Sequence, residues 1–152
     1  MASRLISRGV GIAKSVTKQP VIRSTVATSR FHASALQYAA IKLGSVVERG
    51  DKDFHTTLTE AGDTVVIVDF YADWCGPCRV LAPALKRVVE KNGKTFLVKV
   101  NVDEAGEVAE KYEITSLPTV AAFKSGKMID KFIGSRDEIT ITKFVDSAIA
   151  KK

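Results

Sequence analysis

The sequence has few of the residues that build metal sites or covalent frameworks. Its 152 residues include only two cysteines and two histidines. Two cysteines make at most one disulfide within the chain, which excludes a multiply cross-linked secreted scaffold. A structural zinc site usually needs four ligands, and neither His32 nor His55 lies at finger spacing from the cysteines. We therefore expect no metal.

Long apolar runs are also missing. No stretch approaches the roughly 18 consecutive apolar residues of a membrane-spanning helix, so we expect a mature protein that is not membrane-bound. With 45% apolar and 26% charged residues, the composition is that of an ordinary globular protein. Since roughly 110 residues suffice for one packed core, we expect a single domain with an extension, and a monomer.

Acidic residues are absent from residues 1–42, which carry seven lysine and arginine residues. The rest of the chain holds 16 cations against 17 acids, a net charge of −1, so the overall charge of +6 comes from the leader. A basic domain that would neutralise a phosphate backbone is therefore not present. We expect no nucleic-acid partner.

Residues 1–36 have the composition of a mitochondrial transit peptide. They are rich in Arg, Lys, Ser, Thr and Ala, and cations and hydroxyl groups interrupt every apolar run, unlike the core of a secretory signal. We expect recognition by the import machinery, delivery to the matrix, cleavage between residues 31 and 40, and a folded domain over residues 40–152. A disordered basic tail is the alternative.

After the leader, short β-rich runs alternate with helical patterns, which indicates an α/β fold whose sheet is covered on both faces. The expected strands are residues 41–47, 64–71, 95–102, 119–124 and 128–133, the last two joined by a hairpin turn at Ser125-Gly126. The expected helices begin near residues 51, 75, 104 and 137. The pattern thus predicts five strands and four helices.

The two cysteines lie in the segment WCGPC, where a buried strand is expected to meet a helix. A Cys-x-x-Cys pair in this setting is typical of a redox-active dithiol, which cycles through a disulfide. The free amides and the positive end of the helix dipole favour a thiolate at Cys75. Cys78, one turn later on the same face, is near enough to attack a mixed disulfide. We therefore expect Cys75, at the exposed turn, to be the nucleophile and Cys78, deeper in the helix, to resolve the intermediate.

Gly76 and Pro77, which separate the cysteines, are expected to tune this chemistry. Pro77 fixes its own φ angle and has no amide donor, so it stiffens the small ring and leaves one fewer amide for the thiolate. Such a pair favours the reduction of other disulfides. A static structural disulfide is the other interpretation, although a bridge across so short a loop stabilises a fold very little.

Three further residues are candidates for supporting roles. Asp69 interrupts an apolar strand, where an unpaired carboxylate costs several kcal/mol unless it stays protonated. It is a candidate proton acceptor for Cys78, and Lys99, on a neighbouring strand, is a candidate partner that would tune it. Trp74 offers a flat surface for substrates. The competing interpretations are a structural ion pair or solvated edge charges for Asp69 and Lys99, and a core position for Trp74.

The segment VDFYADWCGPC, residues 68–78, resembles the active-site segment of the thioredoxin family. The resemblance covers residues 40–150 and includes Pro83 inside a helix and the run ITSLPT at residues 114–119. It implies the thioredoxin fold, an α/β architecture with a central five-stranded mixed sheet flanked by four helices.

The resemblance also implies roles for individual residues. Pro118 would be a cis proline packed against the active site, and Leu117 and Pro118 would contact substrate together with Trp74. Asp69 would be the buried acid, with Lys99 as its neighbour. The chain departs from the common pattern at two positions, carrying Tyr71 where many members have tryptophan and Asp73 where many have glutamate.

By this resemblance the protein is a protein-disulfide reductase that acts by thiol–disulfide exchange and contributes to redox homeostasis. An NADPH- and FAD-dependent thioredoxin reductase would restore the dithiol, and peroxiredoxins and other oxidised proteins would accept the electrons. The resemblance implies no bound cofactor, and since the chain lacks a Gly-x-Gly-x-x-Gly loop, the nicotinamide would be handled by another protein.

Two alternatives to a reductase are considered. One is a disulfide isomerase or oxidase, although those relatives commonly place histidine between the cysteines, where its charge makes the disulfide more oxidising. The other is a non-enzymatic interaction module that binds through the surface around Trp74 and Pro118.

Overall fold

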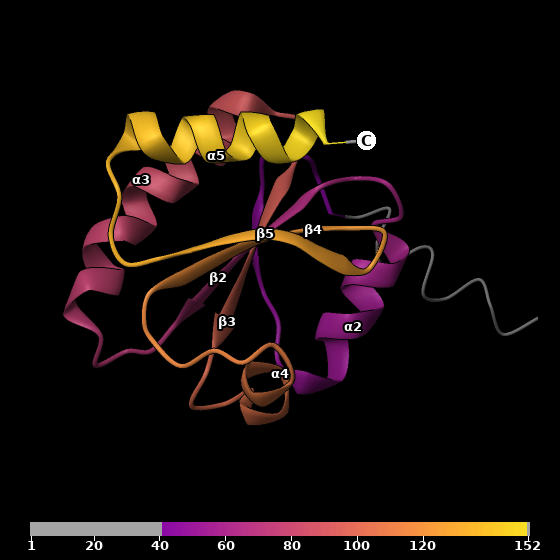
Figure 1. Ribbon diagram of the computed structural model, residues 1–152. Helices are drawn as coiled ribbons and strands as arrows, with labels where there is room; N and C mark the ends of the chain where they lie inside the picture. Colours follow the sequence, from indigo (N-terminus) through magenta and orange to yellow (C-terminus); the bar gives the residue numbers. More distant parts are fainter. Residues whose placement is uncertain (1–40, 152) are drawn as a thin grey trace, which may run out of the picture.

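The structure is a computed structural model and describes residues 41–151. The predicted transit peptide and its cleavage region, as well as His32, lie outside this range. Within the described residues the chain forms five strands and four helices, which confirms the expected α/β class and the number of elements (Figure 1). No helix between residues 41 and 151 combines the length and the apolar content needed to cross a bilayer.

The elements alternate along the chain until the last two strands follow each other directly. The strands are β1 (Val46–Glu48), β2 (Val66–Tyr71), β3 (Phe96–Asn101), β4 (Thr119–Lys124) and β5 (Lys127–Ile133). The helices are α2 (Asp51–Glu60), α3 (Gly76–Asn92), α4 (Gly106–Lys111) and α5 (Glu138–Ala150).

All five strands form one mixed sheet in the order β1-β3-β2-β4-β5. Strands β1, β3 and β2 run parallel, whereas β4 is antiparallel to β2 and β5 is antiparallel to β4. Strand β2 therefore lies at the centre, paired on both sides, and its almost continuous apolar sequence suits burial on both faces. Because β2 leads directly into the cysteine segment, the site begins at the end of the central strand of the sheet.

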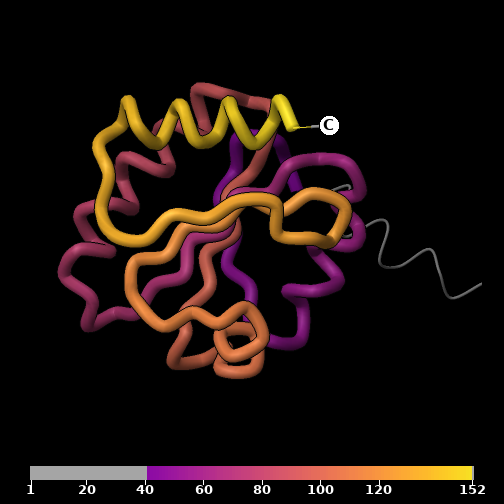
Figure 2. Tube along the Cα trace, in the orientation of Figure 1, coloured from indigo at the N-terminus to yellow at the C-terminus, as the bar shows by residue number. Residues whose placement is uncertain are grey.

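The helices form two layers, with α2 and α4 on one face of the sheet and α3 and α5 on the other (Figures 1 and 2). Side chains alternate along β2 accordingly. Val66, Val68 and Phe70 join the core under α2 and α4, whereas Ile67 joins the core under α3 and α5. Because residues two apart share a face, Asp69 lies on the face covered by α3.

The turns between the elements follow from local sequence. Ser125 and Gly126 both have positive φ angles, of 49° and 74°, as expected for a two-residue hairpin turn. Gly93, with φ 63°, ends α3 in the left-handed conformation, which is common for a glycine that follows a helix. The Asp137 carboxylate caps α5 by accepting a hydrogen bond of 2.7 Å from the Thr140 amide.

Strand β1 differs from its prediction, since it begins at Val46 rather than at residue 41. The chain first makes a turn in which the Ser45 amide donates to the Lys42 carbonyl oxygen. Gly44 has a φ of 80° there, and its amide donates to the Thr95 carbonyl oxygen at 2.7 Å. A left-handed residue breaks the extended run, so the apolar residues before it do not join the sheet.

Candidate active site

The cysteines lie where β2 turns into α3, as the sequence predicts. Cys75 is the N-cap residue of α3, with an extended backbone, and Pro77 occupies the first turn of the helix. The Cys78 amide donates a hydrogen bond of 3.2 Å to the Cys75 sulfur. The two residues form a disulfide in this structure, with 5.3 Å between their Cα atoms. The sulfur of Cys75 thus occupies the position where a helix N-terminus favours negative charge.

Exposure does not separate the two cysteines, although the sequence led us to expect an exposed Cys75. Cys75 is 4% exposed and Cys78 is 3% exposed. Both pack with Ala72, and partly buried apolar side chains, Tyr71 and Leu117 among them, lie against this cluster. What distinguishes the two is their surroundings, because Cys78 lines a cavity beneath the helix start and Cys75 does not.

Trp74 is 70% exposed, so the alternative of a core aromatic residue is wrong. Its indole Nε1 donates a hydrogen bond of 2.9 Å to Oδ2 of Asp103. Asp103 follows β3, and its contact with Trp74 was not predicted from the sequence. Because β2 and β3 run parallel, they end at the same edge of the sheet, and the loops that follow them lie side by side. The expectation of two parallel strands is the signal that could have indicated this contact.

Leu117 and Pro118 lie beside the disulfide. The peptide bond between them is cis, as the resemblance implies. Leu117 packs against the cluster of Cys75 and Cys78, while Pro118 is buried and its carbonyl oxygen accepts a hydrogen bond from the Gly134 amide at 2.8 Å. A partly exposed apolar side chain therefore adjoins the sulfurs, next to the exposed indole ring.

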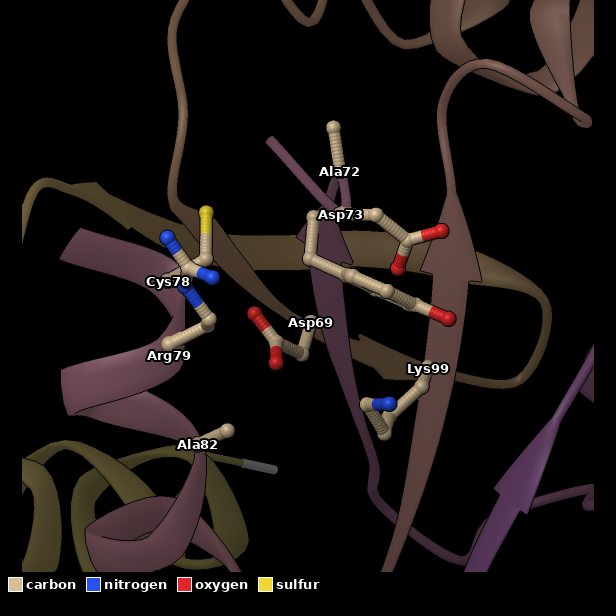
Figure 3. A pocket seen from close by; sticks show the side chains of 8 residues that line it. Asp69, Ala72, Asp73, Cys78, Arg79, Ala82 and Lys99 are labelled. Carbon is tan, nitrogen blue, oxygen red and sulfur yellow. The ribbon is translucent and has the colours of Figure 1, made fainter. Parts of the chain in front are cut away.

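Asp69 is 1% exposed, and neither carboxylate oxygen has a hydrogen-bond partner among the described residues. It lines a cavity of about 180 Å³ together with Cys78 and Lys99, which is large enough to hold water. Figure 3 shows the carboxyl group between the helix that carries Cys78 and the strand that carries Lys99. Burial raises the pKa of Asp69 from 3.8 to about 6, and the charge of Lys99 opposes this rise.

Lys99 is the neighbour of Asp69 but does not form an ion pair with it. The two residues are in register on adjacent strands. The Lys99 ammonium instead lies 2.9 Å from Oε1 of Glu48 and 4.0 Å from the centre of the Tyr71 ring. Lys99 is therefore placed beside Asp69 as expected but pairs with Glu48, and its tuning of Asp69 stays a prediction. Glu48 was missed because no local pattern marks it, and only the pairing of β1 with β3 brings it to Lys99.

The described site contains a disulfide at the start of a helix, a buried carboxyl group that lines the same cavity as one of the cysteines, and a cis proline beside the disulfide. On a β1-β3-β2-β4-β5 sheet, these features define the class of thioredoxin-fold domains that carry a Cys-x-x-Cys pair. Comparison with known families gives the same result, since the thioredoxin family model matches residues 45–147. The chain therefore belongs to the thioredoxin family, whose members are thiol–disulfide oxidoreductases.

Individual relatives agree with this assignment. Mitochondrial thioredoxin of Bos taurus is 44% identical over 88 residues, which are 57% of this chain and 53% of the relative, so the chain spans about half the length of that protein. Thioredoxin of Chlorobaculum thiosulfatiphilum is 38% identical over 107 residues, 70% of this chain and 98% of the relative.

A solved structure is similar as well. A mutant thioredoxin from Halobacterium salinarum has a TM-score of 0.66 and 28% identity, and the similarity covers 74% of this chain and 97% of that one. The five-stranded mixed sheet with its four described helices is therefore the thioredoxin fold.

Proposed function

We propose that the chain is a general protein-disulfide reductase that works by thiol–disulfide exchange through Cys75 and Cys78. The observation that carries this proposal is the placement of the two sulfurs. Cys75 caps α3, where the helix favours a thiolate, and Cys78 shares a cavity large enough to hold water with the buried acid Asp69. An attacking group and a resolving group with its own proton acceptor are the components that disulfide reduction needs.

The reaction starts from the reduced dithiol. The Cys75 thiolate attacks one sulfur of a substrate disulfide, forms a mixed disulfide, and releases the other substrate sulfur as a thiolate that takes a proton from water. Asp69 then accepts the proton of Cys78 across the cavity. The resulting Cys78 thiolate attacks the Cys75 sulfur, the second substrate sulfur leaves as a thiolate that takes a proton from water, and Asp69 gives its proton back to the solvent. The substrate gains two electrons, and the protein is left with the Cys75–Cys78 disulfide.

The residues around the sulfurs would guide this exchange. Trp74 presents an exposed ring, and Leu117 presents apolar surface beside Cys75. Together with Pro118 they form a surface on which an extended substrate segment would lie, while Gly76 and Pro77 set the conformation of the disulfide loop. These roles are part of the proposal.

The proposed electron donor is an NADPH- and FAD-dependent thioredoxin reductase, and the proposed acceptors are peroxiredoxins and other oxidised proteins. We further propose that the protein works in the mitochondrial matrix. The acid-free basic leader supports this location, as do the relatives named as mitochondrial thioredoxins, of which the bovine protein is one.

The test is the dithiothreitol-driven reduction of insulin, followed by precipitation of its B chain. The wild-type protein should accelerate precipitation, and Cys75→Ser should lose that acceleration by about a hundredfold or more, since no attacking thiolate remains. Cys78→Ser is the matched variant, because it keeps the attacking sulfur and removes the resolving one. It should accumulate a covalent adduct with substrate, visible by mass and released by excess thiol. Full activity in Cys75→Ser would refute the proposal.

A further inference from the structure

The surroundings of Asp69 determine how readily it exchanges a proton. The titratable or charged groups that line its cavity come from three elements: Tyr71 of β2 and Asp73 just after it, Cys78 and Arg79 of α3, and Lys99 of β3. Arg79 and Asp73 are exposed, whereas Lys99 is half-buried and directly opposite Asp69 in the sheet. Of the cations that line the cavity, Lys99 is therefore the one whose position decides whether Asp69 forms an ion pair.

Lys99 lies between two carboxyl groups in one row of the sheet. Glu48 of β1 and Asp69 of β2 are both in register with it, one on each side. Adjacent strands are about 4.8 Å apart, and a lysine side chain has a flexible four-carbon stem, so the ammonium can reach either neighbour. In the structure the Lys99 ammonium forms an ion pair with Glu48.

Two contacts hold the ammonium on that side, and a third contact joins the two residues that make them. Its Nζ atom lies 2.9 Å from Glu48 Oε1 and 4.0 Å from the centre of the Tyr71 ring, a cation–π distance. The Tyr71 hydroxyl donates a longer hydrogen bond, of 3.4 Å, to the same Glu48 oxygen. The Glu48 side chain is 68% exposed, so its charge is stabilised by water as well as by Lys99.

We propose that Glu48 is a positioning residue: by holding the Lys99 ammonium against the Tyr71 ring, it keeps Lys99 from pairing with Asp69 and leaves the Asp69 carboxyl free to exchange a proton with Cys78. The inference rests on the proposed disulfide reduction and deepens it. Tyr71 takes part because the ring supplies a second surface for the cation.

The two carboxyl groups respond differently to this arrangement. The hydrogen bond and the charge of Lys99 hold the pKa of Glu48 below its usual value, so Glu48 stays ionised and keeps its partner. The Asp69 carboxylate has no hydrogen-bond partner within residues 41–151, and burial keeps its pKa raised. If Glu48 lost its charge, Asp69 would be the remaining carboxylate beside Lys99, and a pair between them would favour the ionised form of Asp69.

The test is a titration of Asp69 in the full-length oxidised protein, followed by NMR of carboxyl carbons in ¹³C-labelled aspartate. The disulfide form removes thiol titration from the same pH range. The Asp69 signal is assigned by its loss in Asp69→Asn. In Glu48→Gln the midpoint should move to lower pH by about half a pH unit or more. The acid side of the pH profile for insulin reduction should move in the same direction.

The matched control is Glu138→Gln. Glu138 is also an ion-paired glutamate, bound to Arg87 and Lys91, but it does not line the cavity. This variant should leave the Asp69 midpoint unchanged. Dispersed NMR spectra of each variant establish that it is folded.

A second pair of variants separates action through Lys99 from a direct effect of the Glu48 charge. Lys99→Met should move the Asp69 midpoint to higher pH, and adding Glu48→Gln to Lys99→Met should then produce no further downward shift. A midpoint that does not move in Glu48→Gln, or that moves equally in both backgrounds, would overturn the inference. Neither result touches the proposed function, which fails if the wild-type protein does not reduce insulin or if Cys75→Ser keeps full activity.

Discussion

Asp69 is buried without a hydrogen-bond partner among the described residues, and this arrangement links the stability of the fold to pH. The pKa of Asp69 is about 6 in the folded protein, compared with 3.8 for an ordinary aspartate. A raised acid pKa means that the folded state binds the proton more tightly than the unfolded state does. The contribution of protonated Asp69 to the free energy of unfolding is therefore complete below about pH 4 and is lost as the pH rises through 6.

We expect Asp69→Asn to relieve this penalty. At pH 7.5 the free energy of unfolding of the variant should exceed that of the wild type by an amount on the order of 3 kcal/mol. At pH 4 the two values should be similar. Urea unfolding of the oxidised proteins at both pH values measures the difference. Asp146→Asn removes an exposed carboxylate on α5 and serves as the control. An equal difference at both pH values would contradict the expectation.

Among individual residues, the sequence predicted the roles of those whose neighbours along the chain determine their surroundings. The cost of placing Asp69 in an apolar strand identified it as a buried acid, and the WCGPC segment identified both sulfurs. It did not reveal the partner of Lys99, because Glu48 is 51 residues away and meets Lys99 only through strand pairing. The exposure of Trp74 was open for the same reason, since its contact with Asp103 joins two separate loops.

The β4–β5 hairpin depends on the backbone conformation of its turn. Gly126 has a φ of 74°, and an added Cβ would meet no atom within 4 Å, so the strain of Gly126→Ala would come from the backbone alone. We expect this substitution to lower the free energy of unfolding by about 1 kcal/mol, as measured by urea denaturation.

Gly106→Ala is the matched control. Gly106 is the first residue of α4, its φ is not positive, and an added Cβ there also meets nothing within 4 Å. The substitution should be neutral or slightly stabilising, since alanine favours helix. Equal losses of stability in the two variants would show that the turn conformation is not the cause.

Elements with strong end signals matched their predictions within about two residues. The hairpin, the glycine that ends α3 and the aspartate that caps α5 each have a local physical reason that the sequence displays. Strand β1 did not match, because its start depends on a hydrogen bond from Gly44 to Thr95, a residue of another part of the chain. Local periodicity contains no information about such a contact.

We propose that the whole molecule divides into a leader and a domain with separate tasks. The sheet, both cores and the candidate site lie within residues 41–151. A chain that begins at residue 41 should therefore unfold at the same urea concentration as the full-length protein and reduce insulin at the same rate. Residues 1–40 fused to a fluorescent protein should direct it to mitochondria. A diffuse cytosolic signal would contradict the targeting proposal, and a large loss of stability would contradict the division.

The order of the strands in the sheet was not predicted from the sequence. Alternating elements predict a covered sheet, but they do not tell which strand lies in the middle. The long apolar run of β2 was a sound indication of a central strand, because only burial on both faces tolerates it.

The sheet order also has a consequence for crowded solutions. Its two outer strands are β1, which is three residues long, and β5, which carries Lys127, Asp130 and Lys131. An outer strand with free amide and carbonyl groups can recruit a strand from another molecule and start aggregation, and shortness or charge discourages this. At high protein concentration we therefore expect the short β1 and the charged β5 to disfavour pairing between the sheet edges of two copies of the domain.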